Sequence, residues 1–76
     1  MEKKEDIRFS GKLMKERRTA AGVSRARLSI AMDSIVGPHT IENYESGMRV
    51  PTVNTALRIA DALGIKLKDL LDNAKG

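Results

Sequence analysis

The stretch Ser24–Gly47 has the sequence SRARLSIAMDSIVGPHTIENYESG, and it decides the fold. Ser24 is typical of a helix start, because its hydroxyl can accept a hydrogen bond from a free backbone N–H group of the first turn. Leu28 and Met32 follow four residues apart, which places them on one helical face. Pro38 is tolerated only in the first turn of a helix and therefore marks a second start. The stretch predicts two short helices joined by a turn.

The second of these helices is expected over residues 38–45 and has two different faces. Ile41 and Tyr44 lie on one side, and Gly47 suits the left-handed backbone that often ends a helix. The opposite side is polar and consists of His39, Thr40, Glu42 and Asn43. Two short helices across a turn, the second with polar side chains in its first turns, form the geometry that contacts bases in the DNA major groove.

Three more helices are predicted around this pair. Ser10 can cap a helix that ends before Gly22. Thr52 can cap another that ends before Gly64, and this segment has the clearest amphipathic spacing in the chain. A short fifth helix over residues 65–71 is expected to close the core.

The segments at the two ends of the chain lack a comparable pattern. Residues 1–8 are charged and have few apolar anchors, so we expect a flexible N-terminal tail, and residues 73–76 are expected to form a C-terminal tail. No alternation typical of strands is evident. We therefore predict an all-α fold, a compact five-helix bundle that forms one small domain over residues 9–72 and contains a helix-turn-helix.

The composition argues against several classes of functional site. The 76 residues include no cysteine and one histidine, so disulfides and a zinc site with three or four protein ligands are not expected. His39 alone could act as a base near neutral pH, and the chain has neither a nucleophile motif nor a glycine-rich phosphate loop. We predict that the protein is not an enzyme and holds no metal and no cofactor.

Membrane association is not expected either. No apolar run approaches the ~18–20 residues that would span a bilayer, and the N-terminus lacks the apolar segment of a secretory signal. The absence of cysteine is compatible with a reducing compartment. We expect a soluble protein in the cytoplasm.

The positive charge of the chain is concentrated in one segment. The net charge is +4, but residues 12–27 carry six basic side chains and one acidic side chain, which gives +5 in that segment alone. Such a concentration is typical of a surface that binds a polyanion such as nucleic acid. The alternative is an ordinary solvated helix face, which scattered lysines and arginines also produce.

Several separated motifs together resemble a known family. They are Arg18 followed by Gly22-Val23-Ser24, Leu28-Ser29, Ile41-Glu42-Asn43-Tyr44-Glu45-Ser46-Gly47, Pro51-Thr52, and Leu57-Arg58-Ile59-Ala60-Asp61-Ala62-Leu63-Gly64-Ile65. In this order they resemble the XRE family, the helix-turn-helix DNA-binding domain of Cro and phage repressors, over about residues 10–71. The resemblance implies a lambda-repressor-like five-helix bundle whose recognition helix, at about residues 38–45, enters the major groove.

The chain also departs from the usual pattern of this family. Arg25 and Ser29 stand where the family usually has glutamine and alanine, and Lys66 replaces the usual serine or threonine cap of the fifth helix. Within residues 32–36 the chain has about two residues more than the common spacing. These residues lengthen either the preceding helix or the turn, and the sequence leaves both possibilities open.

The resemblance implies base contacts for the polar face of the recognition helix. The residues concerned are Pro38, His39, Thr40, Glu42 and Asn43. Asn43 can pair bidentately with adenine, and His39 can donate to guanine. Thr40 can meet a thymine methyl group or a phosphate, and Glu42 can accept from cytosine. Gly37 and Pro38 would bring the backbone close to DNA without a long side chain. The alternative is that these are solvated polar residues.

Phosphate contacts are implied for the start of the preceding helix and for the loop after the recognition helix. The residues concerned are Ser24, Arg25, Arg27 and Arg49. The free N–H groups after Ser24 lie at the positive end of a helix dipole, and the arginines add charge that can reach an anion. The alternative is that these are ordinary surface arginines.

A structural role is implied for Arg18 and Glu45. The resemblance pairs them as an ion pair between the first helix and the end of the recognition helix. Such a pair fixes how the recognition helix is held, and removal of one partner leaves an uncompensated charge.

The leading functional hypothesis is a sequence-specific, double-stranded DNA-binding transcriptional regulator of the repressor type that acts as a homodimer. We expect no small-molecule effector site within this chain. The alternative is a protein-interaction module, such as an antitoxin-like partner, that uses the same fold. Its contact surface would be Ile30, Ile35 and Val36, provided that these side chains are exposed.

Overall fold

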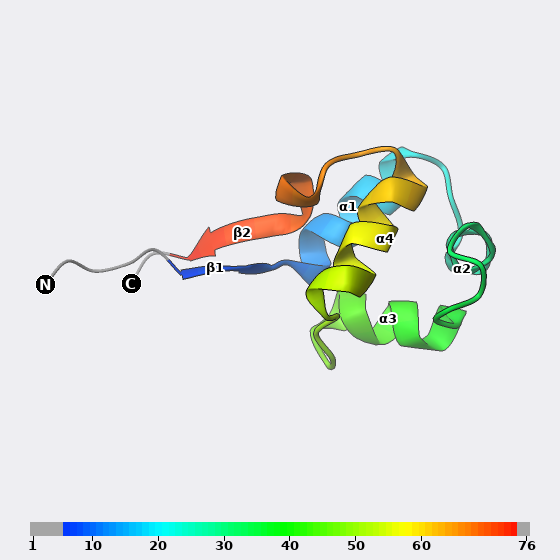
Figure 1. Cartoon of the computed structure of the whole chain (residues 1–76), viewed down its shortest axis with the longest axis horizontal. Helices are drawn as coiled ribbons and strands as arrows, with labels where there is room; N and C mark the ends of the chain where they lie inside the picture. Colours follow the sequence, from blue (N-terminus) through cyan, green and yellow to red (C-terminus); the bar gives the residue numbers. More distant parts are fainter. Residues whose placement is uncertain (1–5, 75–76) are drawn as a thin grey trace, which may run out of the picture.

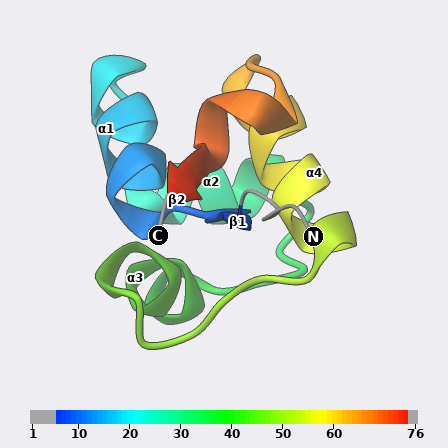
Figure 2. The ribbon, with the colours of Figure 1, turned by 90° about the vertical axis from the view of Figure 1, so that its left-hand side faces the viewer.

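The computed structural model describes residues 6–74 and consists mainly of helices (Figure 1). In chain order the elements are β1 Asp6–Phe9, α1 Gly11–Ala20, α2 Arg25–Ala31, α3 Pro38–Ser46, α4 Val53–Leu63, the 3-10 helix η1 Leu67–Leu70 and β2 Leu71–Ala74. The strands form a two-stranded ribbon that projects from the helical body. In the view along the ribbon, α1, α3 and α4 surround its base, and α3 lies on the side opposite η1 (Figure 2).

The helix starts agree with the predicted cap residues. The hydroxyls of Ser10, Ser24 and Thr52 accept from backbone N–H groups three residues later, at the starts of α1, α2 and α4. The fourth start is Pro38, the first residue of α3. Gly47 has a φ of +85°, the left-handed conformation expected at the end of α3. The helices of the central pair are therefore confirmed.

The predicted fifth helix is not confirmed. Within residues 6–74 there are four α-helices, and the segment expected to form the fifth contains only the 3-10 turn η1. Asp69 accepts from the Lys66 backbone N–H at 3.1 Å, which supports one turn. Leu71 already has an extended backbone, because it pairs with Phe9 in the ribbon. The chain therefore leaves the helical conformation before an α-helix can form.

The ribbon corrects the expectation that the described part of the chain contains no strands. Residues 6–8 and 73–74, which the sequence predicts as parts of two tails, lie in antiparallel strands instead. The register joins Asp6 to Ala74 and Phe9 to Leu71. This pairing depends on backbone groups from opposite ends of the chain, so no local side-chain pattern indicates it. The rest of the predicted tails, residues 1–5 and 75–76, lies outside the described residues.

The core joins all the helices. Its largest fully buried side chains are Met14, Leu28, Ile41, Ile59 and Leu70, one from each of α1, α2, α3, α4 and η1. α3 packs against both α1 and α2. Because Ile41 and Tyr44 anchor one side of α3 in this core, the other side of the helix faces away from it. No helix within residues 6–74 has the length and apolar character needed to cross a bilayer.

Candidate nucleic-acid interface

The polar face of α3 lies at the surface. Pro38, His39 and Glu42 are exposed, and Thr40 and Asn43 are half-buried. His39 Nδ1 lies 3.7 Å from Glu42 Oε1, an exposed pair one helical turn apart. The five residues implied in base contacts are therefore brought together on one helix.

Asn43 carries a side-chain amide that is available for hydrogen bonds on this face. Its backbone carbonyl accepts from the Arg49 N–H at 3.2 Å and from the Ser46 hydroxyl at 3.1 Å. Its side-chain amide has no partner among the described residues. Both the donor and the acceptor of the amide are thus available, which is what a bidentate contact to a base edge requires.

The residues implied in phosphate contacts fall into two groups. Arg27 and Arg49 are exposed, and their guanidinium groups have no partner among the described residues. Ser24 is also exposed, although its hydroxyl is occupied by the N–H of Arg27 at 3.1 Å. Arg25 differs from these residues because the protein itself binds part of its side chain.

A buried carboxylate binds two arginines. The Glu45 side chain is 2% exposed, and its Oε2 lies 2.6 Å from Nε of Arg18. Arg18 Nη2 donates to Glu45 Oε1 at 3.3 Å, and Arg18 Nη1 donates to the carbonyl of Val23 at 2.8 Å. Arg18 and Glu45 therefore join the end of α1, the loop before α2 and the end of α3.

Arg25 is the second arginine on Glu45, and sequence reasoning missed this contact. Its Nε donates to Glu45 Oε1 at 3.0 Å, and its side chain remains 36% exposed. The terminal nitrogens of Arg25 have no partner among the described residues. Arg25 lines a hollow beside α3 together with Lys15, Glu42 and Ser46. The arginine in place of the usual glutamine indicates only an added cation at the start of α2, and no pattern in the sequence places it beside Glu45.

The additional residues lengthen the turn rather than the helix. α2 ends at Ala31, and the backbones of Asp33 and Ser34 are left-handed, each with a φ of +58°. The Ser29 hydroxyl donates to the carbonyl of Val36 at 2.7 Å. Sequence reasoning treated Ser29 only as a departure from the family pattern, and its contact with the turn is new.

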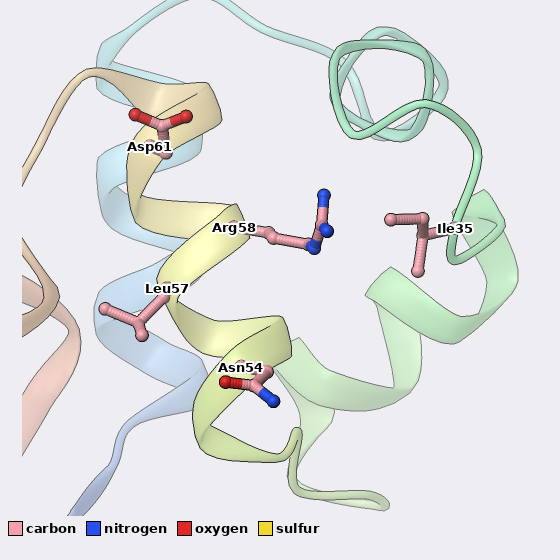
Figure 3. Close-up of a pocket in the computed structure, with 5 residues that line it drawn as sticks. All are labelled: Ile35, Asn54, Leu57, Arg58 and Asp61. Atoms are coloured by element: carbon pink, nitrogen blue, oxygen red, sulfur yellow. The ribbon is translucent and has the colours of Figure 1, made fainter.

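The lengthened turn also exposes apolar side chains. Ile30 is 70% exposed and Ile35 is 51% exposed, whereas Val36 is half-buried and packs against the core. Ile35 extends toward α4, where it lines a groove together with Asn54, Leu57, Arg58 and Asp61 (Figure 3). Two of the three residues that the protein-interaction alternative requires are therefore accessible.

The comparisons with known proteins are consistent with this geometry. A sequence model of a family described as helix-turn-helix matches residues 14–70, well over half of the 76-residue chain. The matched region contains α2, the lengthened turn and α3. No curated protein matches the chain.

Proposed function

Because this chain belongs to the XRE family of helix-turn-helix domains, of the Cro and phage-repressor type, we propose that it binds specific sequences of double-stranded DNA and regulates transcription. The family is one of DNA-binding regulatory domains rather than of enzymes. The observation that carries the proposal is the polar face of α3, which holds the free amide of Asn43 and the exposed side chains of His39 and Glu42. The predicted location in the cytoplasm is part of this proposal.

In the proposed complex, α3 lies in the major groove and contacts base edges. Asn43 pairs with an adenine, and His39 donates to a guanine. Thr40 and Glu42 contact neighbouring positions, and Pro38 allows the backbone to approach closely. This assignment is supported by the burial of Ile41 on the opposite side of the helix, which directs the polar residues outward.

In the same complex, α2 and the loop after α3 contact phosphates. Arg27 and Arg49 supply mobile charges, and the N–H groups that follow Ser24 add partial positive charge. Arg25 contributes through its terminal nitrogens while Glu45 holds its Nε. These contacts set affinity and register without distinguishing one sequence from another.

We further propose that two copies of the chain bind one site. Domains of this kind usually act as two-fold dimers that contact major-groove faces ~34 Å apart. Large apolar side chains are exposed in the loop before α4 and on α4 itself, namely Met48, Val50, Val53 and Leu57. Such side chains are suited to a contact between protein copies. The mass of the complex on a full palindromic site, compared with that on a half-site, measures the stoichiometry.

The central experiment selects bound duplexes from a random library and then titrates the selected duplex and a random duplex at several salt concentrations. The proposal requires an enriched sequence and an affinity that falls linearly with salt on logarithmic axes. A binding curve without salt dependence, or no preference for any sequence over random DNA, would refute it. The length and symmetry of the enriched motif report the site and the number of copies together.

Asn43→Ala is expected to relax the enriched sequence at one base position. Loss of a bidentate pair removes about 1–3 kcal/mol of discrimination against the wrong base at that position. Affinity for random DNA should stay the same, because Asn43 carries no charge. Asn54→Ala removes the same amide from an exposed position on α4 and serves as the matched control. Unchanged discrimination at every position would contradict the role of Asn43.

Arg25→Ala is expected to weaken binding to all duplexes by similar factors and to reduce the salt slope by about 1. The reason is that the terminal nitrogens of Arg25 are proposed to contact a phosphate, which is the same in every sequence. Lys68→Ala makes the same change in charge on η1, which lies away from α3 in Figures 1 and 2. Equal salt slopes for the two variants, or altered sequence preference in Arg25→Ala, would contradict the assignment.

The exposure of Ile30 and Ile35 favours one second candidate function, a protein-interaction module. In that case a partner protein would cover the lengthened turn and its groove. Native mass measurement of the complex purified from its source separates the two functions. A tight complex with another protein, together with no DNA binding at low salt, would support this candidate over the first.

A further inference from the structure

The turn between α2 and α3 has an unusual backbone. Asp33 and Ser34 both have a left-handed conformation, which side chains with a Cβ atom adopt at a cost. Two such residues in succession persist only where other contacts hold them.

Ser29 holds the turn at two points. Its backbone carbonyl accepts from the Ser34 N–H at 2.8 Å, and its hydroxyl donates to the Val36 carbonyl at 2.7 Å. Ser29 is only 5% exposed, so water competes little for these bonds. Two departures from the family pattern, the serine and the lengthened turn, are therefore in direct contact.

The second of these bonds lies next to the start of α3. Val36 is followed by Gly37, the N-cap residue of α3, which makes no side-chain capping bond. The Ser29 hydroxyl therefore ties the chain to α2 just before α3 begins. α2 also carries Arg25, so this tether links the helix with a phosphate candidate to the helix with the base candidates.

We propose that Ser29 is a positioning residue that sets the placement of α3 for base contacts. This proposal rests on the proposed function and adds a residue that touches no DNA. Without the hydroxyl, the protein keeps its charges and its helices. It loses the hydrogen bond that joins Val36 to α2 just before α3 begins. Contacts with phosphate survive this change because long arginine side chains adapt, whereas the bidentate pair of Asn43 depends on the placement of α3.

The test compares Ser29→Ala with the wild-type protein on the selected duplex and on a random duplex. We expect affinity for the selected duplex to fall about fivefold to tenfold, because a displaced α3 loses part of the discrimination that the bidentate pair of Asn43 supplies. Affinity for the random duplex and the salt slope should not change. Thr55→Ala removes a hydroxyl from α4 and should behave as the wild-type protein on both duplexes.

A double-mutant cycle with Asn43→Ala separates positioning from general weakening. If Ser29 acts by placing α3, the Asn43→Ala substitution costs less affinity for the selected duplex in the Ser29→Ala protein than in the wild type. Ser29→Cys keeps nearly the same volume but is a weaker donor, so it should lose specific affinity in the same direction. Circular dichroism melts confirm that each variant is folded at the temperature of the binding measurement.

The possible failures are distinguishable. If the wild-type protein binds the selected and random duplexes equally, the proposed function fails and the role of Ser29 fails with it. If the wild-type protein discriminates but Ser29→Ala loses the same factor on both duplexes, only the role of Ser29 is overturned. Fully additive effects of the Ser29 and Asn43 substitutions would overturn it as well.

Discussion

Glu45→Ala is expected to lower the free energy of unfolding by about 3–5 kcal/mol. The Glu45 carboxylate is almost fully buried and binds Arg18, whose side chain is also buried. Removal of the carboxylate leaves the Arg18 charge without its counter-ion in a poorly solvated place. A domain of this size has a stability of only about 4–11 kcal/mol, so a large part of it would be lost. Urea denaturation followed by circular dichroism measures the change.

Two further variants identify the cause of that loss. Glu45→Gln keeps the size of the side chain but removes its charge, so most of the destabilisation should remain if the ion pair is the cause. Glu42→Ala removes a carboxylate from an exposed position on the same helix and should change the free energy of unfolding by no more than about 0.5 kcal/mol. Equal effects of Glu45→Ala and Glu42→Ala would mean that the buried pair contributes nothing to stability.

Arg18, Arg25 and Glu45 connect stability to the proposed interface. Every nitrogen of the Arg18 guanidinium group donates to an acceptor within the protein. Arg25, by contrast, binds Glu45 through Nε and leaves its terminal nitrogens at the surface. One carboxylate therefore neutralises one arginine and orients the other. This arrangement holds a proposed phosphate contact against the end of the helix that is proposed to contact bases.

The parts of the structure that could be predicted from the sequence are those that local chemistry determines. Ser10, Ser24 and Thr52 cap helices because each hydroxyl accepts a hydrogen bond from the backbone N–H only three residues later. The buried side of α3 follows in the same way from the spacing of Ile41 and Tyr44. Such short-range patterns can be recognised in a single sequence.

The parts that could not be predicted depend on residues far apart in the chain. The contact of Arg25 with Glu45 spans 20 residues, and the ribbon joins residues 6–9 to residues 71–74. Neither leaves a periodic pattern, because the partners meet only after the helices have packed. The choice between a longer α2 and a longer turn was open for a similar reason, since it depends on the Ser29 hydroxyl and on two left-handed residues.

Gly11, in the first turn of α1, lies directly against the backbone of α3, and sequence reasoning gave it no role. A Cβ atom at this position would collide with the carbonyl oxygen of Tyr44 and lie 2.7 Å from that of Glu45. Both oxygens belong to the backbone of α3, so no flexible side chain can move aside. The first turn of α1 therefore requires glycine for space, although glycine is not a favourable helix former.

Gly11→Ala is expected to lower the free energy of unfolding by about 2–3 kcal/mol, the upper part of the range for overpacking, because α1 and α3 must separate. Gly37→Ala is the matched control: a Cβ atom there meets no other group within 4 Å, and its φ of −84° suits any residue. The control should change stability by less than about 1 kcal/mol.

Because the collision is with α3 itself, folded Gly11→Ala protein should also lose more affinity for the selected duplex than for random DNA. Stability equal to that of the Gly37→Ala protein would show that the helices separate without cost, and α1 would then have no part in holding α3.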